Sequence, residues 1–236
     1  MLEVLRNTQE IRLARARLRE TARSGIDGPL RRWLKRRGLA RGPLVGDDLK
    51  SWDVERSLAF IAERLPKDAP ILDLGAYGSE VPVSLARMGY SAVHGVDLNP
   101  AVRDMPMADR VRYAVGDFMR TPYADRSFDA VTATSVIEHG YDAPRLFAEM
   151  ARLLRPGGFF IASFDYWPEK IDTGDTRFFD LSWLIFSWTE VQTLLQTAAG
   201  HGLVPAGPLA HAAQDRPIQC AGFDYTFGWL VLQREG

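Results

Sequence analysis

The sequence has little cysteine, no long apolar run and almost no net charge. Its 236 residues include one cysteine, Cys220, which excludes an internal disulfide and a zinc site made of several cysteines. No stretch approaches the roughly 20 consecutive apolar residues that span a bilayer, and the first residues lack the apolar core of a signal peptide. We therefore expect a cytoplasmic protein that is neither integral to a membrane nor secreted by the general route. No metal site is predicted.

The net charge of −1 is distributed unevenly along the chain. Residues 1–41 carry twelve basic side chains against four acidic ones, whereas the rest of the chain carries 17 basic against 26 acidic. An acidic body does not attract polyanions, which makes nucleic acid an unfavoured partner. Three interpretations of the basic part stay open, in decreasing order of preference: a lid or dimerisation helix, peripheral attachment to the anionic inner face of a membrane, and nucleic-acid contact.

The basic N-terminal part carries a helical pattern. Val4, Ile11 and Leu18 recur every seven residues in an arginine-rich stretch, which predicts an amphipathic helix over about 2–23. This narrow apolar stripe is the feature that favours contact with a membrane surface or with a second copy of the chain in a homodimer.

Glycines and prolines separate this part from the rest of the chain. A second basic stretch, which includes Trp33, lies at 31–38, and the Gly-Pro and Gly-Asp pairs at 42–47 predict a linker. We therefore divide the chain into a basic helical extension, 1–47, and a main domain, 48–236.

Short apolar runs alternate with helical patterns throughout the main domain. The runs predict seven strands near 70–74, 92–97, 111–115, 128–134, 158–164, 203–206 and 225–232. The helical patterns lie at 51–65, 79–89, 143–154 and 188–200. Most runs are apolar without alternation, which is typical of parallel strands covered by helices on both faces. The fold class is therefore α/β, with a doubly wound, mostly parallel seven-stranded sheet and an N-terminal helical extension.

The first predicted strand ends in a loop that is suited to a ligand. In ILDLGAYGSE, residues 71–80, Asp73 is followed by Gly75 and Gly78. Glycines let the backbone approach a ligand closely at the carboxyl end of a strand, where open α/β sheets bind their ligands. The loop lacks the G-x-G-x-x-G spacing of dinucleotide-binding proteins, and an acidic residue ahead of the glycines repels a pyrophosphate. A cationic ligand is therefore favoured over an anionic one.

Acidic residues also follow the next two strands. Asp97 ends the second strand, where a carboxylate can accept hydrogen bonds from the hydroxyls of a ribose. Asp117 and Phe118 follow the third strand and suit hydrogen bonding to an amine and packing on a purine. These residues predict a nucleoside ligand at the carboxyl edge of the sheet.

Together with LLRPGG at 153–158, these motifs resemble those of the class I S-adenosylmethionine-dependent methyltransferases over about 70–164. The resemblance implies a Rossmann-like fold and S-adenosyl-L-methionine as the cofactor. It assigns the methionyl part of the cofactor to Asp73, Gly75, Ala76, Tyr77, Gly78 and Ser135, the ribose to Asp97 and Leu98, and the adenine to Asp117 and Phe118. The loop departs from the D-x-G-x-G-x-G of the family because Tyr77 and Ser79 occupy glycine positions.

Methyl transfer to a hydroxyl needs a base to remove a proton. His139, directly after the fourth strand, is the best placed candidate, with Glu138 beside it and Asp165 at the end of the fifth strand next in order. The alternative is that Glu138 or His139 only caps the following turn.

The acceptor is expected to bind near the tryptophan-rich segment 165–188, which is too long and too aromatic for an ordinary connection. Its Trp167, Trp183 and Trp188 suit an acceptor with flat apolar faces and hydroxyl groups. We expect methyl transfer to a small-molecule or glycan hydroxyl, with sugar O-methylation in polysaccharide or secondary-metabolite biosynthesis preferred. The alternatives are an aromatic natural product as acceptor, a non-catalytic module that binds a nucleoside or partner, and, least favoured, an NAD-dependent oxidoreductase.

Overall fold

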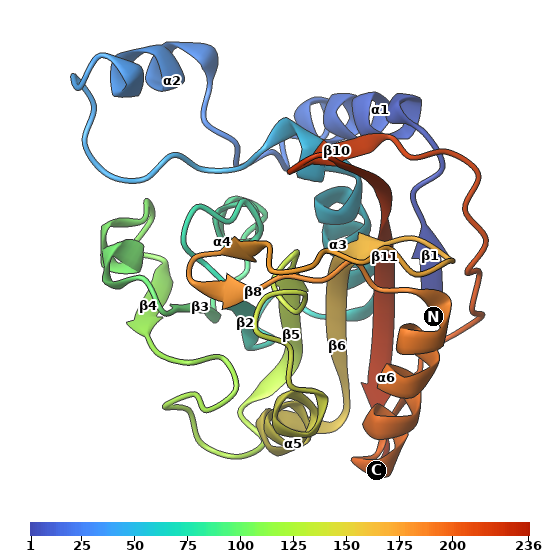
Figure 1. Ribbon diagram of the computed structural model, residues 1–236. Coiled ribbons are helices and arrows are strands. Elements are labelled where there is room, and N and C mark those ends of the chain that lie inside the picture. The colour runs from blue at the N-terminus through green and yellow to red at the C-terminus, as the bar shows by residue number, and fades with distance from the viewer.

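The computed structural model describes residues 1–236 and has one central sheet with the strand order β1-β11-β6-β5-β2-β3-β4 (Figure 1). The strands of this order are β1 (Leu2–Val4), β2 (Ile71–Leu74), β3 (Val93–Asp97), β4 (Val111–Val115), β5 (Phe128–Thr134), β6 (Leu154–Tyr166) and β11 (Phe223–Arg234). Strands β2 to β6 pair in parallel, and β11 is antiparallel to β6. The predicted doubly wound, mostly parallel sheet is confirmed.

Short strands cover the outer edge of β11. Both β1 and β9 (Leu203–Pro205) pair there, with Leu2 opposite Leu230 and Pro205 opposite Leu232. β10 (Ile218–Cys220) forms a hairpin with the beginning of β11. Short edge strands limit unwanted pairing with other chains. The seventh strand of the main path is thus the N-terminal β1, where the sequence predicted a helix.

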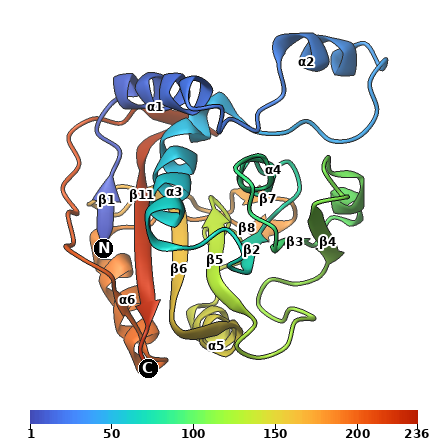
Figure 2. The ribbon, with the colours of Figure 1, turned by 180° about the vertical axis from the view of Figure 1, so that it is seen from behind.

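Helices cover both faces of the sheet and form two apolar cores. α3 (Ser51–Arg64) and α4 (Val81–Arg87) lie on one face, and α5 (Ala143–Leu153) and α6 (Trp188–Gly200) on the other (Figures 1 and 2). The side chains of α3 pack on the sheet residues Ile71 and Ile161, whereas those of α5 and α6 pack on Val131 and Phe160. Because helices bury the strands on both faces, the strands consist of continuous apolar runs rather than alternating ones.

The N-terminal part is folded onto the main domain. The helix predicted over 2–23 is divided into β1 and α1 (Thr8–Glu20), because Asn7 caps α1 by accepting a hydrogen bond from the backbone N–H of Glu10 at 3.1 Å. Ile11 and Leu18 are buried in the core that α1 shares with α3. The apolar stripe that favoured membrane contact therefore faces the domain. The boundary between 1–47 and 48–236 stays a prediction, although these contacts join its two sides.

Residues 28–44, which we call the arm, contain α2 (Pro29–Arg36) and stand away from the sheet (Figures 1 and 2). None of the residues of α2 is buried. The arm is held in shape by Arg32, whose guanidinium donates to the carbonyl oxygens of Val45 at 3.2 Å and Gly46 at 2.7 Å.

A buried ion pair connects α1 to the loop that follows β2. The guanidinium of Arg15 donates to both carboxylate oxygens of Glu80, at 2.8 and 2.7 Å. The side chains are 6% and 1% exposed. Glu80 also accepts hydrogen bonds from the N–H groups of Gly25 at 2.9 Å and Ile26 at 3.1 Å. This pair therefore fixes the N-terminal part against the start of α4.

Replacing Arg15 with Met removes one partner of this buried pair and leaves the charge of Glu80 in the interior. We expect the free energy of unfolding to fall by about 3–5 kcal/mol. Arg17→Met is the matched control on the same helix, because Arg17 forms an exposed pair with Glu55 at 3.2 Å and exposed pairs contribute only about 0–1 kcal/mol. Urea denaturation of both variants measures the difference, and equal losses would contradict the assignment.

Candidate active site

A cavity of about 610 Å³ lies at the carboxyl ends of the parallel strands. Its volume and position are those of ligand sites in open α/β sheets. Five segments line it: Gly46–Val54, Gly75–Glu80, Asp97–Phe118, Thr134–His139 and Phe179–Leu181, each through some of its residues. The first segment joins the end of the basic extension to the start of α3, and the last belongs to the tryptophan-rich segment.

The glycines of the loop after β2 are required by geometry. Gly75 has φ 68°, and a Cβ there would lie 2.4 Å from Cγ2 of Val136. Gly78 has φ 76° and lies against the carbonyl oxygen of Leu44. L side chains rarely adopt such positive φ values. Gly75, Gly78 and Tyr77 line the cavity, whereas Ala76 is buried, and the cofactor role of these four residues stays a prediction.

Asp97 links the loops after β2 and β3. Its carboxylate lines the cavity and accepts hydrogen bonds from the N–H groups of Tyr77 at 2.9 Å and Asn99 at 2.7 Å. Each carboxylate oxygen has a second lone-pair site, so the group can still accept hydrogen bonds from ligand hydroxyls. The neighbouring Leu98 is exposed on the cavity rim.

Asp73 lies behind the glycine loop, outside the cavity lining. Its Oδ1 accepts a hydrogen bond from Oγ1 of Thr132 at 2.6 Å, and its Oδ2 has no partner within the protein. Burial raises the pKa of Asp73 to about 7, against the hydrogen bond from Thr132, which lowers it. A buried carboxyl group with a free oxygen favours a positive charge nearby.

The residues predicted for adenine are separated by the structure. Phe118 lines the cavity. The carboxylate of Asp117 instead accepts from the N–H of Met119 at 2.8 Å and pairs with Arg145 at 3.2 Å, and Asp117 is not part of the lining. The adenine role of Asp117 stays a prediction.

Lys50 is the only lysine or arginine that lines the cavity, and the sequence reasoning missed it. Its ammonium group donates to Oγ of Ser135, lies 4.0 Å from Oδ1 of Asp165, and sits 3.8 Å above the ring of Phe227. Gly46 and Asp47, which also line the cavity, were missed because 42–47 was interpreted as a linker. No local pattern marks these residues, since their position depends on how the N-terminal part packs.

Three buried carboxyl groups surround Lys50 behind the cavity wall: Asp53, Glu138 and Asp165. Burial raises the pKa of Asp53 to about 6, while the charge of Lys50 lowers it. Burial raises the pKa of Glu138 well above its ordinary range, and the nearby Asp165 raises it further. Neither oxygen of Glu138 has a partner within the protein. Glu138 and Asp165 therefore stand behind the lining rather than in it.

His139 is the one predicted catalytic residue that lines the cavity. Its ring lies edge-on to Phe178 and Phe179, with both centroid distances 5.8 Å. Burial lowers the pKa of His139 to about 4, and the charge of Lys50 acts in the same direction. The imidazole is therefore neutral at neutral pH, and its buried Nδ1 has no hydrogen-bond partner within the protein.

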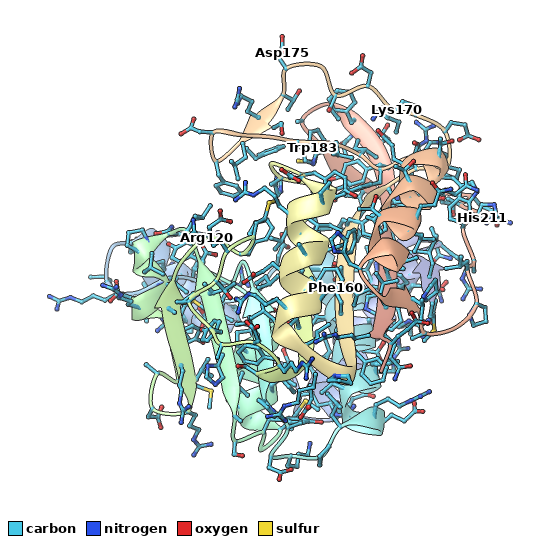
Figure 3. All side chains as sticks on the ribbon, turned by 90° about the horizontal axis from the view of Figure 1, so that it is seen from below. Arg120, Phe160, Lys170, Asp175, Trp183 and His211 are labelled. Carbon is cyan, nitrogen blue, oxygen red and sulfur yellow. The ribbon has the colours of Figure 1, made fainter.

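The tryptophan-rich segment folds over the cavity, but not with the residues that its composition suggested. The hairpin of β7 (Arg177–Phe178) and β8 (Leu181–Ser182) places Phe179 and Leu181 in the lining. Trp183 is buried and donates through Nε1 to Asp165 at 2.8 Å, whereas Asp175 lies at the outer edge (Figure 3). Trp167 and Trp188 also lie outside the lining. Trp183 thus has both apolar cover and a hydrogen-bond acceptor for its indole N–H, whereas the buried Nε1 of Trp167 has no acceptor within the protein.

The family described as "Methyltransferase domain" matches residues 72–162. Methyltransferase GfsG of Streptomyces halstedii is 35% identical over 114 residues, which are 44% of this chain and 41% of that protein. Dimethylglycine N-methyltransferase of Parasynechococcus marenigrum is 29% identical over 113 residues, 44% of this chain and 40% of that protein. The chain thus spans about two fifths of the length of these curated relatives.

Solved structures share the fold at low sequence identity. Geranyl diphosphate C-methyltransferase from Streptomyces coelicolor superposes with a TM-score of 0.59 at 17% identity, covering 88% of this chain and 99% of that one. A sarcosine dimethylglycine methyltransferase from Galdieria sulphuraria gives 0.56 at 17% identity, covering 87% and 97%. Residues 72–162 thus match the methyltransferase domain family, and the sheet order and the superpositions show that the chain has the Rossmann-like fold of the class I S-adenosylmethionine-dependent methyltransferases, a family whose cofactor is S-adenosyl-L-methionine.

No group of three or more histidine, cysteine or acidic side chains is arranged to hold a metal ion. None of the helices combines the length and the apolar character needed to cross a bilayer.

The pKa of Asp73 predicts a pH-dependent stability. The folded protein keeps this carboxyl group neutral up to about pH 7, whereas the unfolded chain ionises it above about pH 4. Stability is therefore fully present below the unfolded pKa and is lost as the pH rises to the folded pKa. Between these pH values, the wild type should lose up to about 4 kcal/mol more of its free energy of unfolding than Asp73→Asn, which keeps an oxygen for Thr132 but does not ionise.

Urea denaturation across the pH range measures this difference between wild type and variant. The exposed Asp109→Asn is the control, because its side chain is 78% exposed. The other buried carboxyl groups are present in all three proteins, so they do not contribute to the difference. Parallel stability curves for the wild type and Asp73→Asn would contradict the assignment.

Proposed function

We propose that the protein transfers a methyl group from S-adenosylmethionine to a hydroxyl group of a small molecule or glycan. The observation that carries this proposal is the cavity itself, in which the glycine loop after β2 and the carboxylate of Asp97 lie side by side at the carboxyl edge of the sheet. Relatives that share about two fifths of their length with the chain include methyltransferases, which supports the reaction class but leaves the acceptor open.

The residues present fit this cofactor. Gly75 and Gly78 open the backbone to a ligand, and Asp97 offers carboxylate oxygens for the ribose hydroxyls. The free oxygen of buried Asp73 favours a cationic ligand, and Phe118 presents an aromatic ring to the cavity for the adenine. When bound, S-adenosylmethionine supplies a methyl group already activated by its sulfonium charge.

The acceptor end of the cavity combines apolar and polar side chains. Phe179 and Leu181 provide apolar surface, while His139 and Ser135 provide groups that can hydrogen-bond to an acceptor hydroxyl. This combination suits a sugar or a hydroxylated aromatic metabolite, of which we prefer the sugar. Neutral His139 is the proposed base, and Glu138 and Asp165 set the electrostatics behind it. A homodimer stays a prediction.

The second candidate function is a non-catalytic module that binds a nucleoside. The observation that favours it is Tyr77, which stands at a glycine position of the family pattern and is exposed on the cavity rim. Such a module would bind the cofactor or its nucleoside part without transferring methyl groups to any acceptor.

Asp97→Ala should weaken the binding of S-adenosylhomocysteine about ten- to hundredfold, because it removes hydrogen bonds from ligand hydroxyls to a charged group. Asp97→Asn, which keeps one accepting oxygen, should give a smaller loss. Asp109→Ala, an exposed carboxylate outside the cavity, is the matched control. Calorimetric titration of the four proteins measures the affinities. Unchanged binding by Asp97→Ala would show that Asp97 does not bind the ribose.

His139→Gln should lower turnover about 10²- to 10⁴-fold while the affinity for S-adenosylhomocysteine stays unchanged, since a general base contributes about this much. The assay is release of S-adenosylhomocysteine across a panel of sugars, nucleotide sugars and phenols. For an active acceptor, the acid limb of the wild-type pH profile should fall near pH 4, following the lowered pKa of His139. Full turnover by the variant would assign the base elsewhere, and no turnover by any protein would favour the non-catalytic module.

A further inference from the structure

Large apolar side chains are exposed mainly on two neighbouring parts of the molecule. Nine such side chains are exposed in the whole structure. Three belong to the arm and three to the cavity rim: Leu30, Trp33 and Leu39 on the arm, and Tyr77, Leu98 and Phe179 on the rim. Exposed apolar residues that gather in this way mark interaction sites, whereas single ones are ordinary.

The arm combines these apolar side chains with a strong positive charge. Its residues, 28–44, include six basic residues and no acidic one. Helical spacing puts Leu30, Trp33 and Leu34 on one face of α2, and Lys35 lies on the opposite face. Trp33, which is 48% exposed, is the most exposed tryptophan of the chain.

Most of the arm's charge is free to meet a partner. Arg31 pairs with Asp27 at 2.9 Å, and Arg32 donates to backbone carbonyls within the arm's base. The other four basic residues form no ion pair: Lys35, Arg36, Arg37 and Arg41. Arg37 lies over the ring of Trp33 at 5.0 Å, which keeps the indole and a cation together on the outer surface.

The base of the arm is part of the cavity. The N–H of Gly46 donates to the carbonyl oxygen of Gly78 in the glycine loop at 2.8 Å, and Gly46 and Asp47 line the cavity. A Cβ at Gly42 would lie 3.2 Å from the carbonyl oxygen of Asp104, which ends the short helix η2 (Pro100–Asp104) beside the rim. These contacts fix the end of the arm beside residues that line the cavity.

We propose that the arm docks on an anionic lipid bilayer and brings the cavity mouth to the membrane surface. A tryptophan and leucines beside lysine and arginine are the residues with which helices bind at the interface of acyl chains and anionic headgroups. Nucleic acid accounts for the charge but leaves the exposed leucines without a contact, and the acidic rest of the chain repels a long polyanion. This docking does not depend on the proposed reaction.

Sedimentation with vesicles of phosphatidylcholine, with and without phosphatidylglycerol, tests the proposal on the full chain. The wild type should bind the anionic vesicles at least tenfold more tightly than the neutral ones. Leu30→Asp/Trp33→Asp should lose most of this binding while keeping its melting temperature, because neither side chain is buried. The matched control is Leu13→Asp on α1, also an exposed leucine in the basic N-terminal part, which should bind as the wild type does.

A second measurement places the contact. Because Trp33 is the exposed tryptophan, lipids brominated on their acyl chains should quench part of the tryptophan fluorescence of the wild type. The same lipids should not quench the fluorescence of Trp33→Phe. The proposal is overturned if the wild type does not bind anionic vesicles at low salt, or if the double variant binds them unchanged. It is also overturned if the protein binds a DNA duplex as tightly as anionic vesicles and the double variant leaves both affinities unchanged. That result would show that the arm binds polyanions in general.

Discussion

The placement of the whole site depends on the buried carboxylate of Glu80. This side chain ends the glycine loop, precedes α4, and accepts hydrogen bonds from Arg15 of α1 and from the backbone of Gly25 and Ile26. A charge that is 1% exposed is stable only where such donors surround it. Because the donors all come from the N-terminal part, satisfying Glu80 places residues 24–50 along the cavity, and Gly46 and Lys50 become part of its lining.

This arrangement also determines the electrostatics around Lys50. Lys50, which directly precedes α3, is the single cation among the buried groups Asp53, Glu138 and Asp165. Burial raises the pKa of each of these carboxyl groups, and Lys50 opposes that rise. The same two causes, burial and Lys50, lower the pKa of His139. Burial is thus the main cause of the shifted pKa values around the cavity, and the charge of Lys50, a residue that no local motif marks, acts on all four groups.

The parts of the fold that the sequence predicted are those that depend on local pattern. Apolar runs such as that of β2 identify buried parallel strands, and a carboxylate directly after a strand, as in Asp97, has its position set by the strand end. The N-terminal strand was missed because Leu2–Val4 is short and its pairing with β11, more than 200 residues away, leaves no local signal. Lys50 was missed for the same reason. The tryptophans of 165–188 were assigned to the pocket because composition identifies an aromatic segment but not which side each ring faces, and Trp183 turns to Asp165 instead.

The most direct test of this account is calorimetric titration of the full chain with S-adenosylmethionine and S-adenosylhomocysteine, with NAD as the comparison ligand. The glycine loop and Asp97 should bind the first two with a Kd on the order of micromolar, while the loop lacks the G-x-G-x-x-G spacing with which dinucleotide-binding proteins hold the pyrophosphate of NAD. Saturable binding of the two methionine-derived ligands without NAD is the predicted result. Absence of binding to either, or equal binding of NAD, would contradict the assignment of the cavity.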